Sequence, residues 1–334
     1  MFQMQAIKKS GLPVLAVDIG GNKILTTIIS NEGQVMAREY CLTLADEGFE
    51  GVINRIFSAI DHVFSQINID LSQLDSISIA AAGAIDFKKG IITSSPNLPG
   101  WYDIPLRNIV KEKYEVNTFL INDANAAVLG EHHFGVGQEV NNLVLLTLGT
   151  GIGGGIIIDG RLYPGASGSA GEIGHMTIDI NGPRCNCGNI GCLETLASGM
   201  AVAKEAIRRI GQGEESSLGK IVDGVVENIT AEKVSIAAQG GDSLAAEVIL
   251  RAATYLGVGM VNLVNIFNPE MIIIGGGMVK MGAPLLNLAR QVVRERAFQL
   301  SAQAVQIVPA QLGDDAGVLG AAVFAFQQKT KREG

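Results

Sequence analysis

The residues best suited to chemistry lie in one short segment, residues 172–194, which holds three of the four cysteines and one of the four histidines. His175, Cys185, Cys187 and Cys192 supply three thiols and one imidazole, the donor set of a closed tetrahedral zinc site. The segment is rich in glycine and has no apolar run to organise it. We therefore expect a structural zinc ion here, with ordinary reduced thiols in a turn as the alternative.

Two carboxylates, Glu172 and Glu194, bracket these four residues. A metal ion that fixes the segment would also fix both carboxylates, and carboxylates held in this way suit recognition of hydroxyl groups on a substrate. Clustered cysteines fit metal binding in a reducing compartment better than they fit a disulfide framework. The pattern therefore favours a cytoplasmic protein.

A first glycine cluster follows an apolar strand directly. Its backbone N–H groups can face an anion, because glycine has no Cβ to interfere. Asp18, at the end of the strand, could hold a hydrated Mg²⁺ ion. The expected phosphate-binding residues are Asp18, Gly20, Gly21, Asn22 and Lys23. A plain hairpin turn is the alternative.

Two further glycine clusters also follow apolar strands. The first of them matches G-x-G-x-x-G, but residues 155–158 after it read as a strand, whereas the dinucleotide-binding fingerprint must open a helix. The other precedes a predicted helix and offers flat backbone to an adenine or a ribose, or is a simple turn. Three clusters at strand ends favour a nucleoside triphosphate. The residues are Gly149, Thr150, Gly151 and Gly153, and Gly275, Gly276 and Gly277.

Asp123 lies where a predicted strand ends and a helix begins. It could cap the helix, since aspartate is favoured at that position. It could also be a general base that accepts a hydroxyl proton during phosphoryl transfer. Asn97 and Asn122 are amides that could bind sugar hydroxyls or belong to turns.

The elements that position these residues follow a repeated plan. Residues 14–35 and 143–163 each read as a strand, a glycine turn, a second strand and a second turn. Strands are expected at 76–80, 117–121 and 271–274, and helices at 51–66, 124–134, 198–210, 244–265, 284–298 and from 316. This alternation predicts two related α/β domains with a cleft between them. The expected domains are residues 1–122 plus 316–334, and residues 123–315.

Composition limits the class of protein. The 334-residue chain is 47% hydrophobic and 17% charged, as in globular proteins. Its net charge of −8, with no basic cluster, argues against a nucleic-acid partner. The N-terminal apolar run is too short for a signal peptide or a membrane span, so we expect no membrane association.

These motifs together resemble the ROK family of sugar kinases and repressors, within the actin-like (ribonuclease H-like) and hexokinase-like ATPase fold. The resemblance rests on DIGGNK, IND at 121–123, LGTGIGGG, EIGH and CNCGNIGCLE. It implies that Asp123 is the catalytic base and that His175 serves both zinc and sugar. The implied sugar contacts are Asn97, Asn122, Asp123, Glu172, His175 and Glu194. It also implies a homodimer or homotetramer, with the zinc segment and the dimerisation surface on the larger domain.

The chain departs from the family pattern at Asn22, where threonine is usual in the first phosphate loop. Repressors of the family resemble the kinases but carry an N-terminal helix-turn-helix, for which the residues before the first strand are too few. We therefore expect a glucokinase that makes glucose 6-phosphate. N-acetylmannosamine kinase and N-acetylglucosamine kinase are the first alternative, and a non-catalytic sugar sensor is the second.

Overall fold

The computed structural model describes residues 11–67, 69–95 and 97–333, with side chains up to residue 329. The expectation that the N-terminal segment forms no signal peptide, membrane span or helix-turn-helix concerns residues 1–10, which lie outside this range. The described chain divides into two units. The first comprises the chain up to Asn141, Gly155–Ala170 and the segment from Gln311 onward, and the second comprises Asn142–Gly154 and Gly171–Ala310.

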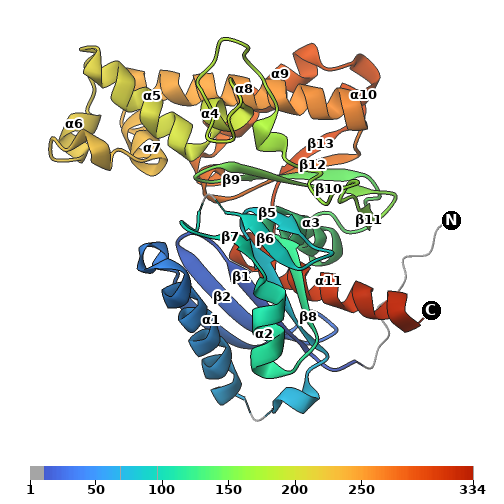
Figure 1. The fold of residues 1–334 in the computed structure, drawn as a ribbon. Helices are drawn as coiled ribbons and strands as arrows, with labels where there is room; N and C mark the ends of the chain where they lie inside the picture. The colour runs from blue at the N-terminus through green and yellow to red at the C-terminus, as the bar shows by residue number, and fades with distance from the viewer. Residues whose placement is uncertain (1–10, 68, 96, 334) are drawn as a thin grey trace. The chain divides into compact units, whose positions relative to one another are not determined.

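The first unit is built on a five-stranded mixed sheet in the order β3-β2-β1-β4-β8 (Figure 1). Strand β1 pairs antiparallel with β2, which confirms the first predicted hairpin, and β2 pairs antiparallel with β3. Strand β4 pairs parallel with β1, and β8 pairs parallel with β4. The strands are β1 (Val14–Ile19), β2 (Lys23–Ile29), β3 (Val35–Leu42), β4 (Ser76–Ala81) and β8 (Thr118–Asn122). Its helices are α1 (Gly48–Ser65), α2 (Leu106–Tyr114), α3 (Asp123–Phe134) and α11 (Ala316–Glu333).

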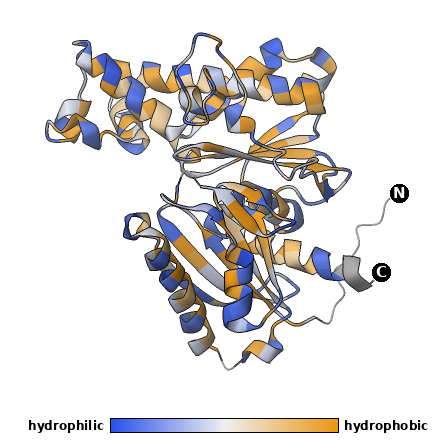
Figure 2. Ribbon diagram, viewed as in Figure 1, coloured by the Kyte–Doolittle hydropathy of each residue, from blue (hydrophilic) through white to orange (hydrophobic). Residues whose placement is uncertain are grey.

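Alternation along β1 decides which side chains are buried on which face. Leu15, Val17 and Ile19 belong to the fully buried core shared with α1, α2 and Trp101. Asp18 points to the opposite face, where α11 packs on the sheet. Figure 2 shows the apolar residues gathered in the strands and the hydrophilic ones on the outer side of α1. The same alternation that builds the core therefore turns a carboxylate toward α11.

A small second sheet of the first unit was not predicted from the sequence. It has three strands in the order β5-β6-β7. They are β5 (Ala84–Asp86), β6 (Ile91–Ser94) and β7 (Tyr102–Ile104), each of three or four residues. Segments this short show no reliable alternation of apolar and polar residues, so periodicity cannot reveal them.

Helices α3 and α11 cross at two glycines. A Cβ on Gly320 would lie 1.6 Å from the carbonyl oxygen of Ala126, and one on Gly130 would lie 2.4 Å from that of Ala316. Only glycine permits so close an approach of two helices. Helix α3 belongs to the first unit, whereas the second domain was expected to begin at residue 123.

Gly320→Ala should lower the free energy of unfolding by about 2 kcal/mol or more, because the added methyl group forces the helices apart. Thermal or urea unfolding measures the loss. Gly211→Ala is the matched control, since Gly211 ends a helix with open space around its Cβ position. Equal stability of the two variants would contradict the close packing at Gly320.

The other five-stranded sheet has the order β11-β10-β9-β12-β13. The division between the two units passes through its strand β10. Strands β9, β12 and β13 run parallel. Strands β9 and β10 are neighbours joined by the glycine turn, as in the second predicted hairpin, and β10 also pairs antiparallel with β11. The strands are β9 (Leu143–Leu148), β10 (Ile152–Ile158), β11 (Arg161–Leu162), β12 (Met271–Gly275) and β13 (Gln306–Pro309). Helices of the second unit are α4 (Leu193–Ala197), α5 (Gly199–Gly211), α6 (Leu218–Ile221), α7 (Ala231–Gln239), α8 (Ser243–Phe267), α9 (Ala283–Arg296) and α10 (Gln299–Ala304).

Helix α8 is the centre of the second unit and packs against α4, α5, α7 and α9. It is the one helix of the described chain whose length and apolar composition would allow it to cross a membrane. Of its most apolar window, 61% is buried inside the unit. Burial of that kind is usual for the core helix of a globular domain.

Candidate active site

The first glycine loop is a tight connection between β1 and β2. Gly20 N donates to Lys23 O at 2.9 Å. Thr43 braces the loop twice, because its N–H donates to Asn22 O at 3.0 Å and its hydroxyl donates to Gly20 O at 2.7 Å. A Cβ on Gly21 would lie 3.0 Å from the Cβ of Asn97. The loop is therefore held in one shape, with a predicted sugar-binding amide beside it.

Asp18 and Asp123, two carboxylates of the first unit, interact electrostatically. Burial, with a smaller contribution from the Asp123 carboxylate, raises the pKa of Asp18 to about 7, while Lys23 acts in the opposite direction. A Cβ on Gly317 would lie 2.3 Å from Asp18 Oδ2, so this carboxylate abuts the first turn of α11. Two close carboxylates are a natural site for a divalent cation or for proton transfer.

Asp18 should make stability depend on pH. Its folded pKa, about 7, lies above its ordinary value of 3.8. Its stabilising contribution is therefore complete below about pH 4 and is lost as the pH rises through 7, by up to about 4 kcal/mol. Asp18→Asn carries no charge and should melt at a higher temperature than the wild type at pH 8, with the difference shrinking toward pH 4.

Thermal melts across this pH range test that expectation. Asp46→Asn, at an exposed position, is the control for loss of a surface charge. If the melting temperatures of the wild type and of Asp18→Asn differed by the same amount at every pH from 4 to 8, the raised pKa would be contradicted.

The structure separates the roles of Asn122 and Asp123. Asn122 is the N-cap of α3: its Oδ1 accepts from Ala124 N at 3.0 Å and from Asn125 N at 3.1 Å, and its Nδ2 donates to Gly83 O at 3.1 Å. Asp123 is the first residue of the helix, and its Oδ1 accepts from Ala124 N at 2.8 Å. The capping interpretation thus applies to Asn122, so α3 does not depend on a cap from Asp123.

Lys23, a predicted phosphate ligand, pairs with Asp314 at 2.7 Å. The segment before Asp314 is held by Glu131, which is fully buried in α3. Glu131 Oε1 accepts from Gln311 N at 2.9 Å and from Leu312 N at 2.7 Å. Sequence reasoning missed both Glu131 and Thr43, because a buried carboxylate or hydroxyl that bonds to distant backbone leaves no local pattern.

The other two glycine clusters adjoin each other in the second unit. Gly275 pairs with Thr147 across the parallel strands β12 and β9, and a Cβ on Gly276 would lie 2.3 Å from Leu148 O. Gly149 N donates to Gly151 O at 3.0 Å, and Gly149 O accepts from Gly199 N at 2.8 Å. Glycine residues are therefore adjacent at the carboxyl ends of two neighbouring strands, and their backbone lies where ligands of open α/β sheets bind.

Glu172, His175 and Glu194 also come together in the second unit. Glu172 Oε2 lies 3.9 Å from His175 Nε2. Burial raises the pKa of Glu172, the Glu194 carboxylate adds to the increase, and His175 opposes it. Glu194 Oε2 accepts from Ile152 N at 2.9 Å, next to the second glycine loop. The two carboxylates can accept hydrogen bonds from the hydroxyls of a polyhydroxy ligand, and the imidazole adds a further hydrogen-bonding group.

The four predicted zinc ligands converge. Their donor atoms all lie within 4.8 Å of one another. His175 Nδ1 is 3.7 Å from Cys185 Sγ, and Cys187 Sγ is 3.8 Å from Cys192 Sγ. Bonds of about 2.3 Å from zinc to sulfur put tetrahedral vertices about 3.8 Å apart. The donor set and its spacing therefore fit zinc, with His175 Nδ1 as the ligand and Nε2 turned toward Glu172.

The fold and these loops define the actin-like class of ATPase, as expected from the sequence. The family model described as "ROK family" matches residues 14–328. The chain belongs to the ROK family, and the resemblance drawn from its motifs is confirmed.

Named relatives include both branches of the family. A glucokinase of Halalkalibacterium halodurans is 37% identical over 322 residues, 96% of each chain. A xylose repressor of Caldicellulosiruptor bescii is 36% identical over 307 residues, 92% of this chain and 76% of the repressor. The crystal structure of a ROK family glucokinase from Streptomyces griseus in complex with glucose and AMPPNP superposes with a TM-score of 0.82 at 34% identity, covering 94% of this chain and 99% of that one.

Proposed function

We propose that this chain is an ATP-dependent glucokinase that transfers the γ-phosphoryl group of ATP to the 6-hydroxyl of glucose. The observation that carries the proposal is the electrostatic interaction of Asp18 with Asp123, together with the position of Asp18 on the strand that leads into the hydrogen-bonded glycine loop of the first unit. Phosphoryl transfer needs positioned phosphates, a cation and a base for the acceptor hydroxyl, and these residues have the required chemistry. The relatives that bear the name glucokinase support the same activity.

Asp123 is the proposed base. Its carboxylate accepts the proton of the 6-hydroxyl while that oxygen forms a bond to the γ-phosphorus and the bond from phosphorus to the ADP oxygen breaks. Asp123 can do this without loss of helix structure, because Asn122 caps α3. The products are ADP and glucose 6-phosphate.

ATP and Mg²⁺ fit the residues available to them. The proposed phosphate-binding residues are those of the three glycine clusters, with Lys23 released from Asp314 as a charge for the phosphates. Asp18 would hold Mg²⁺ through its water shell, since a carboxylate is the ligand that this ion prefers. When bound, Mg²⁺ would neutralise charge on the phosphate oxygens.

Zinc is proposed as the structural ion of the second unit. His175, Cys185, Cys187 and Cys192 would hold it, and the spacing of their donor atoms supports this. A fixed His175 ring keeps Nε2 directed toward Glu172, so the ion would orient residues that contact the sugar without taking part in the reaction.

The proposed sugar-binding residues form one group in each unit. Asn97, Asn122 and Asp123 belong to the first unit, and Glu172, His175 and Glu194 belong to the second. The first group offers two amides and a carboxylate to hydroxyls, and the second offers two carboxylates and an imidazole. The same set would accept N-acetylmannosamine or N-acetylglucosamine, so glucose is proposed on the family relatives and these two sugars are the alternatives.

A coupled ADP-release assay tests the proposal, with MgATP and a panel of glucose, mannose, fructose, N-acetylglucosamine and N-acetylmannosamine. We expect strong turnover with glucose. Turnover confined to an N-acetylhexosamine would keep the kinase and change its substrate. Absence of turnover with every sugar, in folded and zinc-loaded protein, would reject the activity.

A sugar-responsive regulator is the second candidate, because a xylose repressor is 36% identical to this chain. Presence of Asp123 favours the kinase. A retention assay on genomic DNA fragments at physiological salt separates the two functions. We expect no sequence-specific retention, and a tight complex with one fragment would favour the regulator.

We further propose a cytoplasmic homodimer or homotetramer without a nucleic-acid or membrane partner. The net charge of −8 supports the absence of a nucleic-acid partner. Three thiols that would hold zinc need reducing conditions, which supports the cytoplasm. Light scattering on the purified protein measures the oligomeric state.

A further inference from the structure

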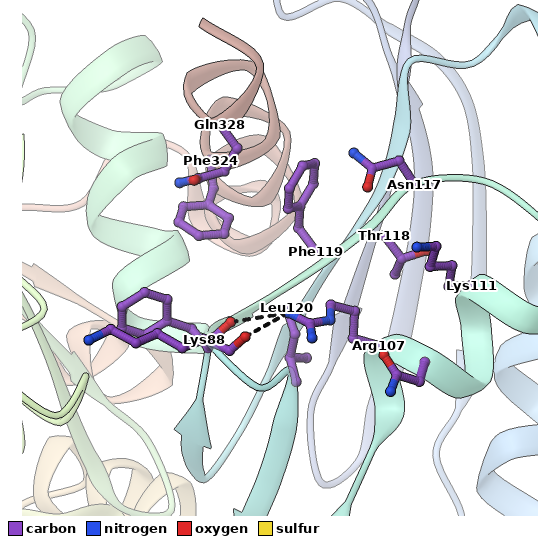
Figure 3. Close-up of a pocket in the computed structure, with 11 residues that line it drawn as sticks. Lys88, Arg107, Lys111, Asn117, Thr118, Phe119, Leu120, Phe324 and Gln328 are labelled. Atoms are coloured by element: carbon purple, nitrogen blue, oxygen red, sulfur yellow. Dashed lines mark hydrogen bonds between the residues drawn. The ribbon is translucent and has the colours of Figure 1, made fainter. Parts of the chain in front are cut away.

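A cavity in the first unit lies outside every residue assigned above. Its volume is about 410 Å³, within the range of small-molecule sites. The walls come from α2, the start of β8, the C-terminal half of α11 and the loop after β5. Figure 3 shows the aromatic rings Phe119 and Phe324 together with Gln328 on one side, and Arg107 and Lys111 of α2 on the other.

The charge of the lining has one sign. Lys88, Arg107 and Lys111 line the cavity, and none of the described lining residues is acidic, although the chain carries a net charge of −8. Arg107 and Lys111 are four residues apart on α2, so they project from the same side of the helix and repel each other. An anion between them would remove this repulsion.

Arg107 is held in place for such a role. Its Nη1 donates to Lys88 O at 3.0 Å, which is drawn as a dashed line in Figure 3. Its Nη2 donates to Lys89 O at 2.6 Å. These carbonyl groups fix the guanidinium without neutralising its charge. No ion pair is found for Lys88 or Lys111 within the described residues. A fixed cation with two flexible neighbours is well suited to a phosphate group.

The opposite wall suits a ring. Phe119 and Phe324 meet edge to face, with centroids 6.2 Å apart, and both are only partly buried. Flat rings stack on exposed phenylalanine faces. Asn117 and Gln328 add amide groups that can bond to the polar edge of a ring.

We propose that this cavity is a second ligand site, which binds a small phosphate monoester that carries a ring. The phosphate contacts Arg107 and Lys111, and the ring packs against Phe119 and Phe324. Two sources have this chemistry, a nucleoside monophosphate and a hexose phosphate. None of the residues proposed for phosphoryl transfer lines the cavity, so the site does not depend on the proposed function.

Isothermal titration with AMP, glucose 6-phosphate and inorganic phosphate tests the site. Saturating glucose, Mg²⁺ and AMPPNP are present throughout to fill the proposed kinase site. Separate titrations of glucose and AMPPNP report on that site, so its failure is distinguishable from failure of the cavity. We expect AMP or glucose 6-phosphate to bind at least about tenfold more tightly than inorganic phosphate. The tighter of the two identifies the source.

Two variants of α2 localise the binding. Lys111→Glu should weaken the bound ester at least about tenfold. Lys113→Glu makes the same charge change on the same helix, at a residue that packs over Phe57 and does not line the cavity, and should leave the affinity unchanged. Phe324→Leu should weaken the ester several-fold and spare inorganic phosphate. Absence of binding by both esters, or equal affinity in the two lysine variants, would overturn the proposal.

Discussion

Asp123→Asn is expected to lower kcat for glucose phosphorylation by about 10²- to 10⁴-fold, the usual contribution of a general base. Asparagine has the size of aspartate but cannot accept the hydroxyl proton. The glucose KM should stay within about threefold of wild type, because an amide still bonds to a sugar hydroxyl. Steady-state kinetics with the coupled assay measure both constants.

The cap residue provides the matched control. Asn122→Ala should lower the free energy of unfolding by about 1 kcal/mol, since α3 loses the side chain that accepts from Ala124 N and Asn125 N. Asp123→Asn should unfold like the wild type. Turnover of Asp123→Asn close to the wild-type rate would exclude Asp123 as the base, whatever its effect on stability.

Cys187→Ser has the second largest expected effect. The purified wild type should contain one equivalent of zinc per chain, and the variant should lose most of it, because three ligands bind zinc far more weakly than four. Cys187 is exposed, so the serine itself disturbs no packing. With the metal lost, His175 and Glu172 are no longer held, and the glucose affinity should fall at least about tenfold.

Cys41→Ser controls for loss of a thiol, since Cys41 is the one cysteine outside the cluster. It should keep both its zinc and its glucose affinity. Metal analysis and glucose titration are made on the three proteins in parallel. A wild-type protein that is free of zinc and still binds glucose normally would reject the structural ion.

Much of the fold could be predicted from periodicity and turns. Both glycine-turn hairpins, at 14–35 and 143–163, are present as neighbouring strands, because an apolar run, a glycine turn and a second apolar run are local signals. Helix α8 was expected at 244–265 and spans Ser243–Phe267. What could not be predicted depends on distant contacts. The crossing of α3 and α11 at Gly130 and Gly320 has no trace in either segment alone.

The same distinction applies to the candidate site. Convergence of His175, Cys185, Cys187 and Cys192 followed from their spacing, since they share one short segment. The raised pKa of Asp18 could not be foreseen, because its causes come from burial and from parts of the chain far apart in sequence. The aromatic and basic cavity was likewise invisible, since four separate elements contribute its walls.

The most direct test of the proposed glucokinase is to identify its product. Glucose and MgATP are incubated with the zinc-loaded chain, and ADP and glucose 6-phosphate are quantified together, the latter through glucose-6-phosphate dehydrogenase, with Asp123→Asn in parallel. We expect one glucose 6-phosphate for each ADP from the wild type and almost none from the variant. Absence of ADP with the wild type, or a product phosphorylated at another hydroxyl of glucose, would contradict the proposed activity.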